Sequence, residues 1–156
     1  QDPQVKPAGL GARDVLRQEI GLCLYGNDLS EEITPLEAGL EFFVDWEKNF
    51  RGRKELERQK ANGVGRLRTA LYTDSRRAPR SGDRIQISGE DVGWVSSGVF
   101  SPMLKAGIGM GYIVSEYAYP NKAVTVTDGK KRSLDAETTG FPLYRHGSAR
   151  NTISKE

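Results

Sequence analysis

The sequence contains little of the side-chain chemistry on which many enzymes depend. Its 156 residues include one cysteine, Cys23, and one histidine, His146. A lone cysteine excludes an intramolecular disulfide, and with a single histidine it excludes a zinc site of the usual kind. A catalytic triad based on histidine is excluded as well, since His146 falls in the C-terminal tail. A reducing compartment is therefore the expected setting.

Long apolar runs and an excess of one charge are also missing. No stretch approaches the ~20 apolar residues of a membrane helix, and the N-terminus has no signal-peptide pattern. The 23 basic and 21 acidic residues are spread along the chain and give a formal net charge of +2. We therefore expect neither nucleic acid nor membrane as a partner. The densest basic run, residues 76–80, is interpreted mainly as a solvated loop, with an anionic ligand as the minor alternative.

The first part of the chain has the pattern of an amphipathic helix. Ala12, Leu16 and Ile20 recur at four-residue spacing, beginning at about residue 11. Short strands are expected over residues 22–25 and 41–44. These elements are too few to close a core alone, so the apolar face of the helix must pack on the rest of the chain or on protein outside it.

A capping pattern predicts a second, short helix over residues 35–40. Thr34 can cap this helix, Pro35 suits its first position, and Glu37 can reach back to the cap. A third helix, which is highly charged, is expected over residues 50–60.

From residue 64 onward the pattern becomes β-type. Six short β-prone runs, separated by turn residues, cover 66–72, 84–88, 92–96, 109–114, 123–127 and 132–138. Hairpin turns are expected at residues 88–91 and at Asp128 and Gly129, because Asp-Gly tolerates the positive φ of a tight turn. The predicted fold class is α+β, with a partial α/β segment followed by a small antiparallel β-barrel of Greek-key or jelly-roll type.

Few individual residues suggest chemistry. Arg13 lies in the first turn of the first helix, where a cation meets the positive end of the helix dipole. Either Asp14 offsets its charge or it points to solvent, or else it holds a carboxylate in a forked pair. Asn27 and Asp28 are interpreted as a turn, and residues 96–98 as a loop, since a G-x-S-x-G nucleophile motif is absent. Cys23, with no His or Lys near it in sequence, is expected to be a small core residue.

Four motifs nevertheless follow one another in a specific order. They are GLGARDVLRQEIGLCLYGNDL at residue 9, TPLEAGL at 34, VGWVSSGVFSPMLKAGIGMGYI at 92 and GFPLYR at 140. In this order they resemble the C-terminal half of the aminomethyltransferases, or T-proteins, of the glycine cleavage system. The resemblance covers nearly the whole chain, from about Gly9 to Arg145.

The resemblance implies a domain organisation. Residues 1–50 correspond to the C-terminal part of the folate-binding domain, 51–63 to a connecting helix and 64–145 to the barrel. The polar tail, residues 146–156, matches nothing in the family and is expected to be disordered. The N-terminal half of the family protein is missing here.

The resemblance also implies a function. T-proteins transfer a one-carbon unit from the aminomethyl-lipoyl group of H-protein to tetrahydrofolate and release ammonia. Arg13, Tyr144 and Arg145 match family positions that contact folate or substrate. The family's catalytic aspartate lies in the missing half, so we expect no catalytic residue and no metal here, and this chain alone is expected to be inactive. The implied partners are that missing half and lipoylated H-protein, in the cytoplasm or the mitochondrial matrix.

Two alternatives remain open. The chain could be a non-catalytic folate-binding or interaction module. It could also be the folate domain of a relative of the sarcosine and dimethylglycine dehydrogenase type, or of a demethylase.

Overall fold

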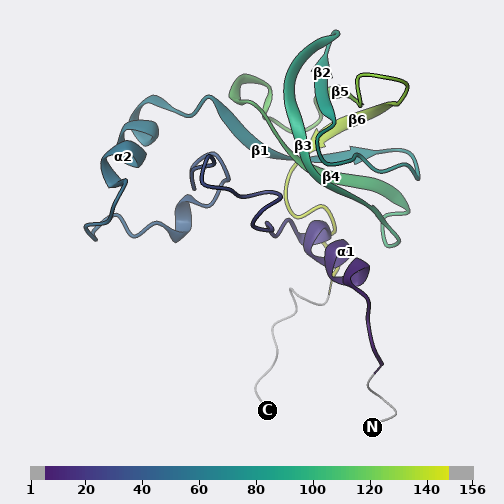
Figure 1. Ribbon diagram of the computed structural model, residues 1–156, viewed down its shortest axis with the longest axis horizontal. Coiled ribbons are helices and arrows are strands. Elements are labelled where there is room, and N and C mark those ends of the chain that lie inside the picture. The colour runs from purple at the N-terminus through teal and green to yellow at the C-terminus, as the bar shows by residue number, and fades with distance from the viewer. Residues whose placement is uncertain (1–5, 148–156) are drawn as a thin grey trace.

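The computed structural model describes residues 6–147 and contains two helices and a closed β-barrel (Figure 1). The helical elements are α1 (Leu10–Ile20), α2 (Arg53–Asn62) and two single 3-10 turns, η1 (Glu41–Phe43) and η2 (Ser115–Tyr117). The strands are β1 (Arg66–Thr73), β2 (Arg84–Ile87), β3 (Glu90–Ser101), β4 (Ala106–Val114), β5 (Ala123–Thr127) and β6 (Ser133–Thr139). The predicted α+β class with a small antiparallel barrel is confirmed. Residues 1–5, and residues 148–156 of the predicted disordered tail, lie outside the described part.

The six strands close the barrel in the order β1-β4-β3-β2-β5-β6, and β6 pairs again with β1. All neighbouring strands are antiparallel. Each predicted β-prone run overlaps one of these strands, but β3 is longer than expected. Residues 96–98, interpreted from sequence as a loop, lie within β3 and pair with β4. The loop prediction was wrong because the serine hydroxyls find buried partners, which removes the cost of placing them inside the fold.

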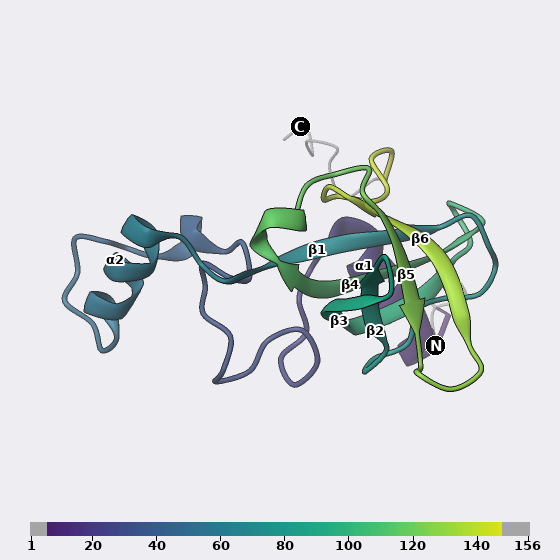
Figure 2. The same cartoon turned by 90° about the horizontal axis from the view of Figure 1, so that it is seen from above.

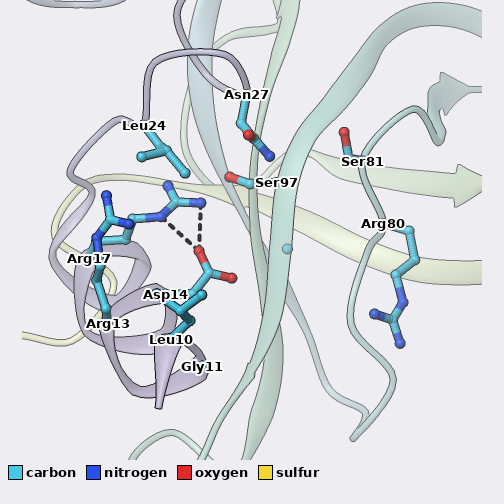
Figure 3. A pocket seen from close by; sticks show the side chains of 11 residues that line it. Leu10, Gly11, Arg13, Asp14, Arg17, Leu24, Asn27, Arg80, Ser81 and Ser97 are labelled. Carbon is cyan, nitrogen blue, oxygen red and sulfur yellow. Dashed lines mark hydrogen bonds and ion pairs between the residues drawn. The ribbon is translucent and has the colours of Figure 1, made fainter. Parts of the chain in front are cut away.

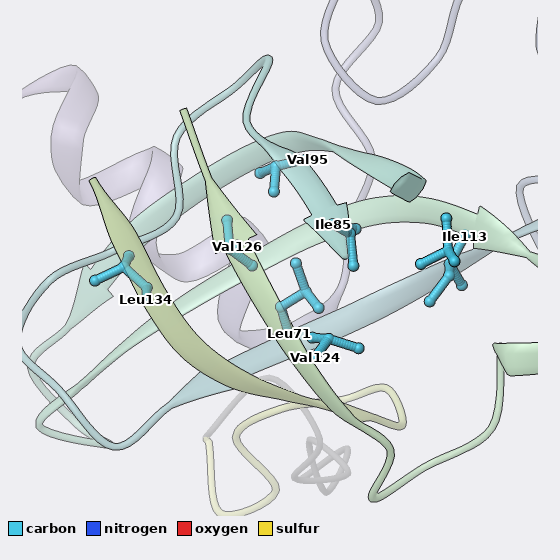
Figure 4. Close-up of a cluster of buried hydrophobic side chains, with 8 residues drawn as sticks. Leu71, Ile85, Val95, Ile113, Val124, Val126 and Leu134 are labelled. Carbon is cyan, nitrogen blue, oxygen red and sulfur yellow. The ribbon is translucent and has the colours of Figure 1, made fainter. Parts of the chain in front are cut away.

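Apolar side chains from the strands fill the barrel (Figure 4). They alternate with outward-facing residues, as the two-residue period of a strand requires. The buried cluster consists of Leu71, Ile85, Val92, Val95, Ile113, Val124, Val126 and Leu134. This core belongs to the barrel alone, so the segment before it depends on other interactions.

The loop between β1 and β2 lies directly on strands β3 and β4. A Cβ atom at Gly98 would be 2.2 Å from the carbonyl oxygen of Pro79, and one at Gly107 would be 2.2 Å from that of Arg77. Both glycines are needed because the backbone of the loop occupies the space of a side chain. The close approach fixes the position of the loop, including Arg80, relative to β3.

Helix α1 packs on β3 and β4 with its polar side. Arg17, Gln18 and Glu19 are buried, whereas the side chains of Leu10 and Leu16 are 81% and 63% exposed. Of the two alternatives for the apolar face, packing on the barrel does not hold for Leu10 and Leu16. The polar side turns inward because Glu19 accepts a hydrogen bond from the Ser101 hydroxyl of β3, and Arg17 pairs with Asp28 of the loop that follows α1.

The segment between α1 and β1 contains less regular structure than expected. Instead of the two predicted short strands, residues 22–25 hold only an isolated bridge between Tyr25 and Leu29, and residues 41–43 form η1. Figures 1 and 2 show the part that carries η1 and α2 extending away from the barrel. None of the helices in the described residues is both long and apolar enough to cross a membrane.

The predicted helix over residues 35–40 is a single turn. The capping box does form, with the Thr34 N–H donating to Glu37 Oε2 at 2.8 Å and the Glu37 N–H donating to Thr34 Oγ1 at 3.3 Å. Gly39, at a φ of +68°, then ends the turn before a second one can follow. The helix prediction was wrong because the stop signal follows the start signal too closely.

This capped turn is attached to β1. Arg66 Nε donates to Glu37 Oε1 at 2.8 Å, and Arg68 Nε donates to the carbonyl oxygen of Ala38 at 2.8 Å. Arg68 Nη1 also donates to the carbonyl oxygen of Gly21, at the end of α1. The two arginines thus connect β1 with the turn and with the end of α1.

We predict that Gly98→Ala lowers the free energy of unfolding by about 1–3 kcal/mol, because the new methyl group would overlap the backbone of Pro79. Gly65→Ala is the matched control, since no atom lies within 4 Å of a Cβ there. Urea unfolding followed by circular dichroism measures both variants. Equal stability of the two would show that the loop is not held at Gly98.

Candidate functional site

A pocket of about 610 Å³ lies between α1, the loop that follows it, the β1–β2 loop and β3 (Figure 3). Most of the residues that line it are polar, and they include three arginines, Arg13, Arg17 and Arg80. Among the described residues, Asp14 is the one acidic residue that lines it. The charges in this pocket decide what it can bind.

The buried carboxylate of Asp28 connects the elements that form the pocket, namely α1, the loop that follows it and β3. Asp28 is 1% exposed and accepts four hydrogen bonds. Oδ2 accepts from Arg17 Nη1 at 2.6 Å and from the Leu24 N–H at 2.9 Å, and Oδ1 accepts from the hydroxyls of Ser96 and Ser97 at 2.5 and 2.6 Å. A buried carboxylate requires such partners to compensate its lost hydration.

Two adjacent serines reach the same oxygen atom because β3 is irregular at this point. The register between β3 and β4 shifts between Val95 and Ser97, as in a β-bulge. In a regular strand, Ser96 and Ser97 would point to opposite faces, and the bulge turns both toward Asp28. Tyr112 on β4 adds a hydrogen bond from its hydroxyl to the backbone oxygen of Asp28, at 2.7 Å.

Arg17 is compensated by two carboxylates. Besides Asp28, its guanidinium contacts Asp14 Oδ1 at 2.7 Å, the ion pair drawn with dashed lines in Figure 3. Asp14 therefore offsets the charge of Arg17, so of the alternatives for Arg13, the one in which Asp14 offsets its charge does not hold, and Arg13 is exposed. Arg13 lines the pocket with Arg80, and neither side chain has an ion-pair partner among residues 6–147.

The other predicted site residues lie elsewhere. Tyr144 borders a separate hollow of about 500 Å³ together with Leu16 and Met103. Its N–H donates to the carbonyl oxygen of Glu19 at 2.8 Å. Arg145 is exposed and lines neither hollow. The structure therefore does not bring Tyr144 and Arg145 together with Arg13.

Other reactive groups are held neutral or engaged. Burial raises the pKa of the Cys23 thiol, which keeps its nucleophilic thiolate form scarce near neutral pH. Burial likewise raises the pKa of the Tyr112 hydroxyl, which donates to Asp28. No group of three or more His, Cys, Asp or Glu side chains suited to a metal ion occurs in residues 6–147.

Sequence reasoning missed the buried part of the site. Asp28 was interpreted as a turn residue and Arg80 as part of a solvated loop, although an anionic ligand was the minor alternative for that loop. The three-residue spacing of Asp14 and Arg17 on a helix does indicate a pair. Nothing in the sequence indicates that Ser97 approaches Asp28, because that contact depends on a bulge between distant segments.

Comparisons with known proteins identify similar chains. Residues 66–145 match the family described as the glycine cleavage T-protein C-terminal barrel domain, and residues 1–48 match the GCVT N-terminal domain. A probable aminomethyltransferase of Pyrococcus horikoshii is 42% identical over 86% of this chain, and an aminomethyltransferase of Phocaeicola vulgatus is 46% identical over 90%. The match covers 40% of each relative.

A solved structure is also similar. The crystal structure of the glycine cleavage system aminomethyltransferase T from Bartonella henselae superimposes with a TM-score of 0.84 at 31% sequence identity. The match covers 91% of this chain and 40% of that one. The chain thus spans well under half the length of the proteins it resembles.

We predict that Asp28→Asn lowers the free energy of unfolding by about 3 kcal/mol, because it leaves the buried Arg17 with one carboxylate instead of two. Asp91→Asn removes a similar charge from an exposed pair with Arg84 and should cost less than about 1 kcal/mol. Urea unfolding compares the two. A small, equal effect would mean that Asp28 does not secure α1.

Proposed function

The chain belongs to the glycine cleavage T-protein family, and we propose that it is the C-terminal portion of a tetrahydrofolate-dependent aminomethyltransferase. The longer protein takes the aminomethyl group from the lipoyl arm of H-protein. Its methylene carbon passes to tetrahydrofolate, and its nitrogen leaves as ammonia. In this proposal the activity belongs to the longer protein, in the cytoplasm or the mitochondrial matrix, because this chain spans 40% of its relatives.

The observation that carries the proposal is the guanidinium of Arg13, which lines the pocket and has no ion-pair partner among residues 6–147. Tetrahydrofolate ends in a glutamyl tail, whose carboxylates are suitable partners for arginine. Arg17 is held by two carboxylates and serves to position α1, whereas Arg13, one turn earlier, retains its charge for a ligand. In this assignment Arg13 binds and orients the substrate, and the groups that move protons lie in the N-terminal portion.

Tyr144 and Arg145 have a different role in this proposal. Tyr144 borders an apolar hollow on the other flank of α1, so it does not share a carboxylate with Arg13. Its ring is suited to stack on a flat group or to pack against the N-terminal portion. The assignment of Tyr144 and Arg145 as folate contacts stays a prediction, as do the domain boundaries at residues 50, 63 and 145.

The exposed apolar side chains favour a portion of an enzyme over an independent module. Leu10, Leu16, Phe42 and Phe43 are each more than 60% exposed. When several large apolar side chains of one segment are exposed, the surface they form is typically covered by other protein. We propose that the N-terminal portion of the same protein covers them.

The alternative of a flavin-linked dehydrogenase of the sarcosine or dimethylglycine type predicts a glycine-rich dinucleotide motif upstream in the gene. The glycine-cleavage assignment predicts that this motif is absent. The upstream sequence decides between them.

We predict that Arg13→Gln weakens tetrahydrofolate binding by about 1–3 kcal/mol in the full-length protein, through loss of a charged hydrogen bond. Isothermal titration calorimetry measures the affinity. Arg77→Gln, which removes an equal charge from an exposed residue outside the pocket, should leave it unchanged. An unaltered affinity for the Arg13 variant would remove this residue from the folate site.

We also predict that the 156-residue chain self-associates when it is produced alone, because apolar area on its surface is uncovered. Size-exclusion chromatography with light scattering should show that Leu16→Lys combined with Phe43→Lys shifts the chain toward monomer. Tyr119→Lys, at a half-exposed residue of the loop between η2 and β5, serves as the control. A stable monomer of the parent chain would instead support the independent module.

A further inference from the structure

The hollow on the other flank of α1 combines apolar walls with a buried carboxylate. It has a volume of about 500 Å³, and its apolar walls come from Leu16, Ile20, Met103 and the ring of Tyr144. Among the described residues, Glu19 is the one carboxylate that lines it. The surroundings of Glu19 therefore decide which partner this hollow can receive.

Glu19 is buried although only one of its two carboxylate oxygens has a hydrogen-bond donor. The residue is 3% exposed, and Oε1 accepts a hydrogen bond from the Ser101 hydroxyl at 2.6 Å. Within residues 6–147, no donor contacts Oε2, and no lysine, arginine or histidine forms an ion pair with the carboxylate. A buried carboxylate is costly unless several donors or a cation compensate it.

The other buried carboxylate near α1 is fully compensated by the fold. Asp28 accepts four hydrogen bonds, one of them from the guanidinium of Arg17. Glu19 differs because it borders a hollow whose walls are accessible, since Leu16 and Met103 are 63% and 58% exposed. A group that enters the hollow can therefore donate to Oε2.

The position of Glu19 is fixed on both sides of the hollow. The Ser101 hydroxyl that donates to its carboxylate also accepts from the Leu104 N–H at 3.1 Å, which ties Glu19 to the turn between β3 and β4. The carbonyl oxygen of Glu19 accepts from the Tyr144 N–H at 2.8 Å. The carboxylate is thus held in place before any partner arrives, which reduces the entropy lost on binding.

We propose that this hollow receives a lysine or arginine side chain of another polypeptide segment, whose cationic group pairs with Glu19. Such a side chain has an aliphatic stem that can pack on Leu16 and Met103 and a charged end that the carboxylate can accept. The assignment of the segment to the N-terminal portion of the same protein rests on the proposed function. The preference of the hollow for an apolar group that carries a cation does not depend on it.

Thermal unfolding of Glu19→Gln in two contexts tests the pairing. Glutamine retains an acceptor for the Ser101 hydroxyl and removes only the charge. In the full-length protein the variant should lower the melting temperature by about 3 °C or more, because the cation of the partner segment loses its carboxylate. In the 156-residue chain it should cause no loss, because no cation pairs with Glu19 there. Glu137→Gln, at an exposed residue of β6, is the matched control and should be neutral in both contexts.

A small cation tests the hollow in the 156-residue chain alone. 4-Methylbenzylammonium carries an apolar ring and a primary ammonium group, and 4-methylbenzyl alcohol is its neutral counterpart. In NMR titrations at millimolar concentrations, the ammonium should bind about threefold to tenfold more tightly than the alcohol, since the hollow is partly open to solvent. Glu19→Gln should abolish this preference, and Glu137→Gln should retain it.

A loss of stability in the 156-residue chain as large as that in the full-length protein would overturn the pairing with another segment. Equal binding of the ammonium and the alcohol to the parent chain would overturn the cation site. A dimer of the full-length protein that Glu19→Gln dissociates would assign the hollow to a second copy instead. Failure of the proposed function has a different result, because the full-length protein would then not bind tetrahydrofolate, while the preference for the ammonium and its loss in Glu19→Gln would remain.

Discussion

The buried ion pair between Arg17 and Asp28 is the interaction on which the N-terminal part of this chain depends. The barrel has its own apolar core, but α1 contributes mainly polar side chains to its contact with β3 and β4. Burial of two charges carries a large desolvation cost, which is offset only when every polar atom is satisfied. Here the carboxylate of Asp28 accepts four hydrogen bonds, from α1, from its own loop and from Ser96 and Ser97 of β3. One side chain therefore connects α1 and the loop that follows it with β3, which is distant in sequence.

This polar contact has a structural consequence for the opposite face of α1. A helix that satisfies its charges against the barrel leaves its apolar residues, including Leu10 and Leu16, on the outside. In a self-contained domain the orientation would be reversed, because apolar burial is the main stabilising term. The orientation is typical of a helix in a middle layer, with the barrel on one side and further protein on the other. It agrees with a chain that spans 40% of its relatives.

The barrel was predictable from the sequence because its signals are local. β-Prone runs and turn residues located all six strands, and the hairpin turn expected within residues 88–91 forms at Ser88 and Gly89, both of which have positive φ. The turn at Asp128 and Gly129 is longer than the expected two residues, since Asp128 Oδ1 accepts three backbone N–H groups and so stabilises a five-residue loop. The buried site was not predictable, because it depends on a bulge and on contacts across 68 and 69 residues of chain between Asp28 and the two serines.

The arginines of this chain show how paired and unpaired charges divide structural and binding roles. Arg17, Arg66 and Arg68 each donate to two or more acceptors in the fold, and they connect elements that would otherwise be separate. A guanidinium used in this way has little capacity left for a ligand, because its donors are already engaged. Arg13 lies one helical turn before Arg17. The buried pair between Arg17 and Asp28 fixes the position of α1, and the backbone of Arg13 is therefore fixed as well. A fixed backbone position favours ligand binding by Arg13, because less conformational entropy is lost when the side chain holds a ligand.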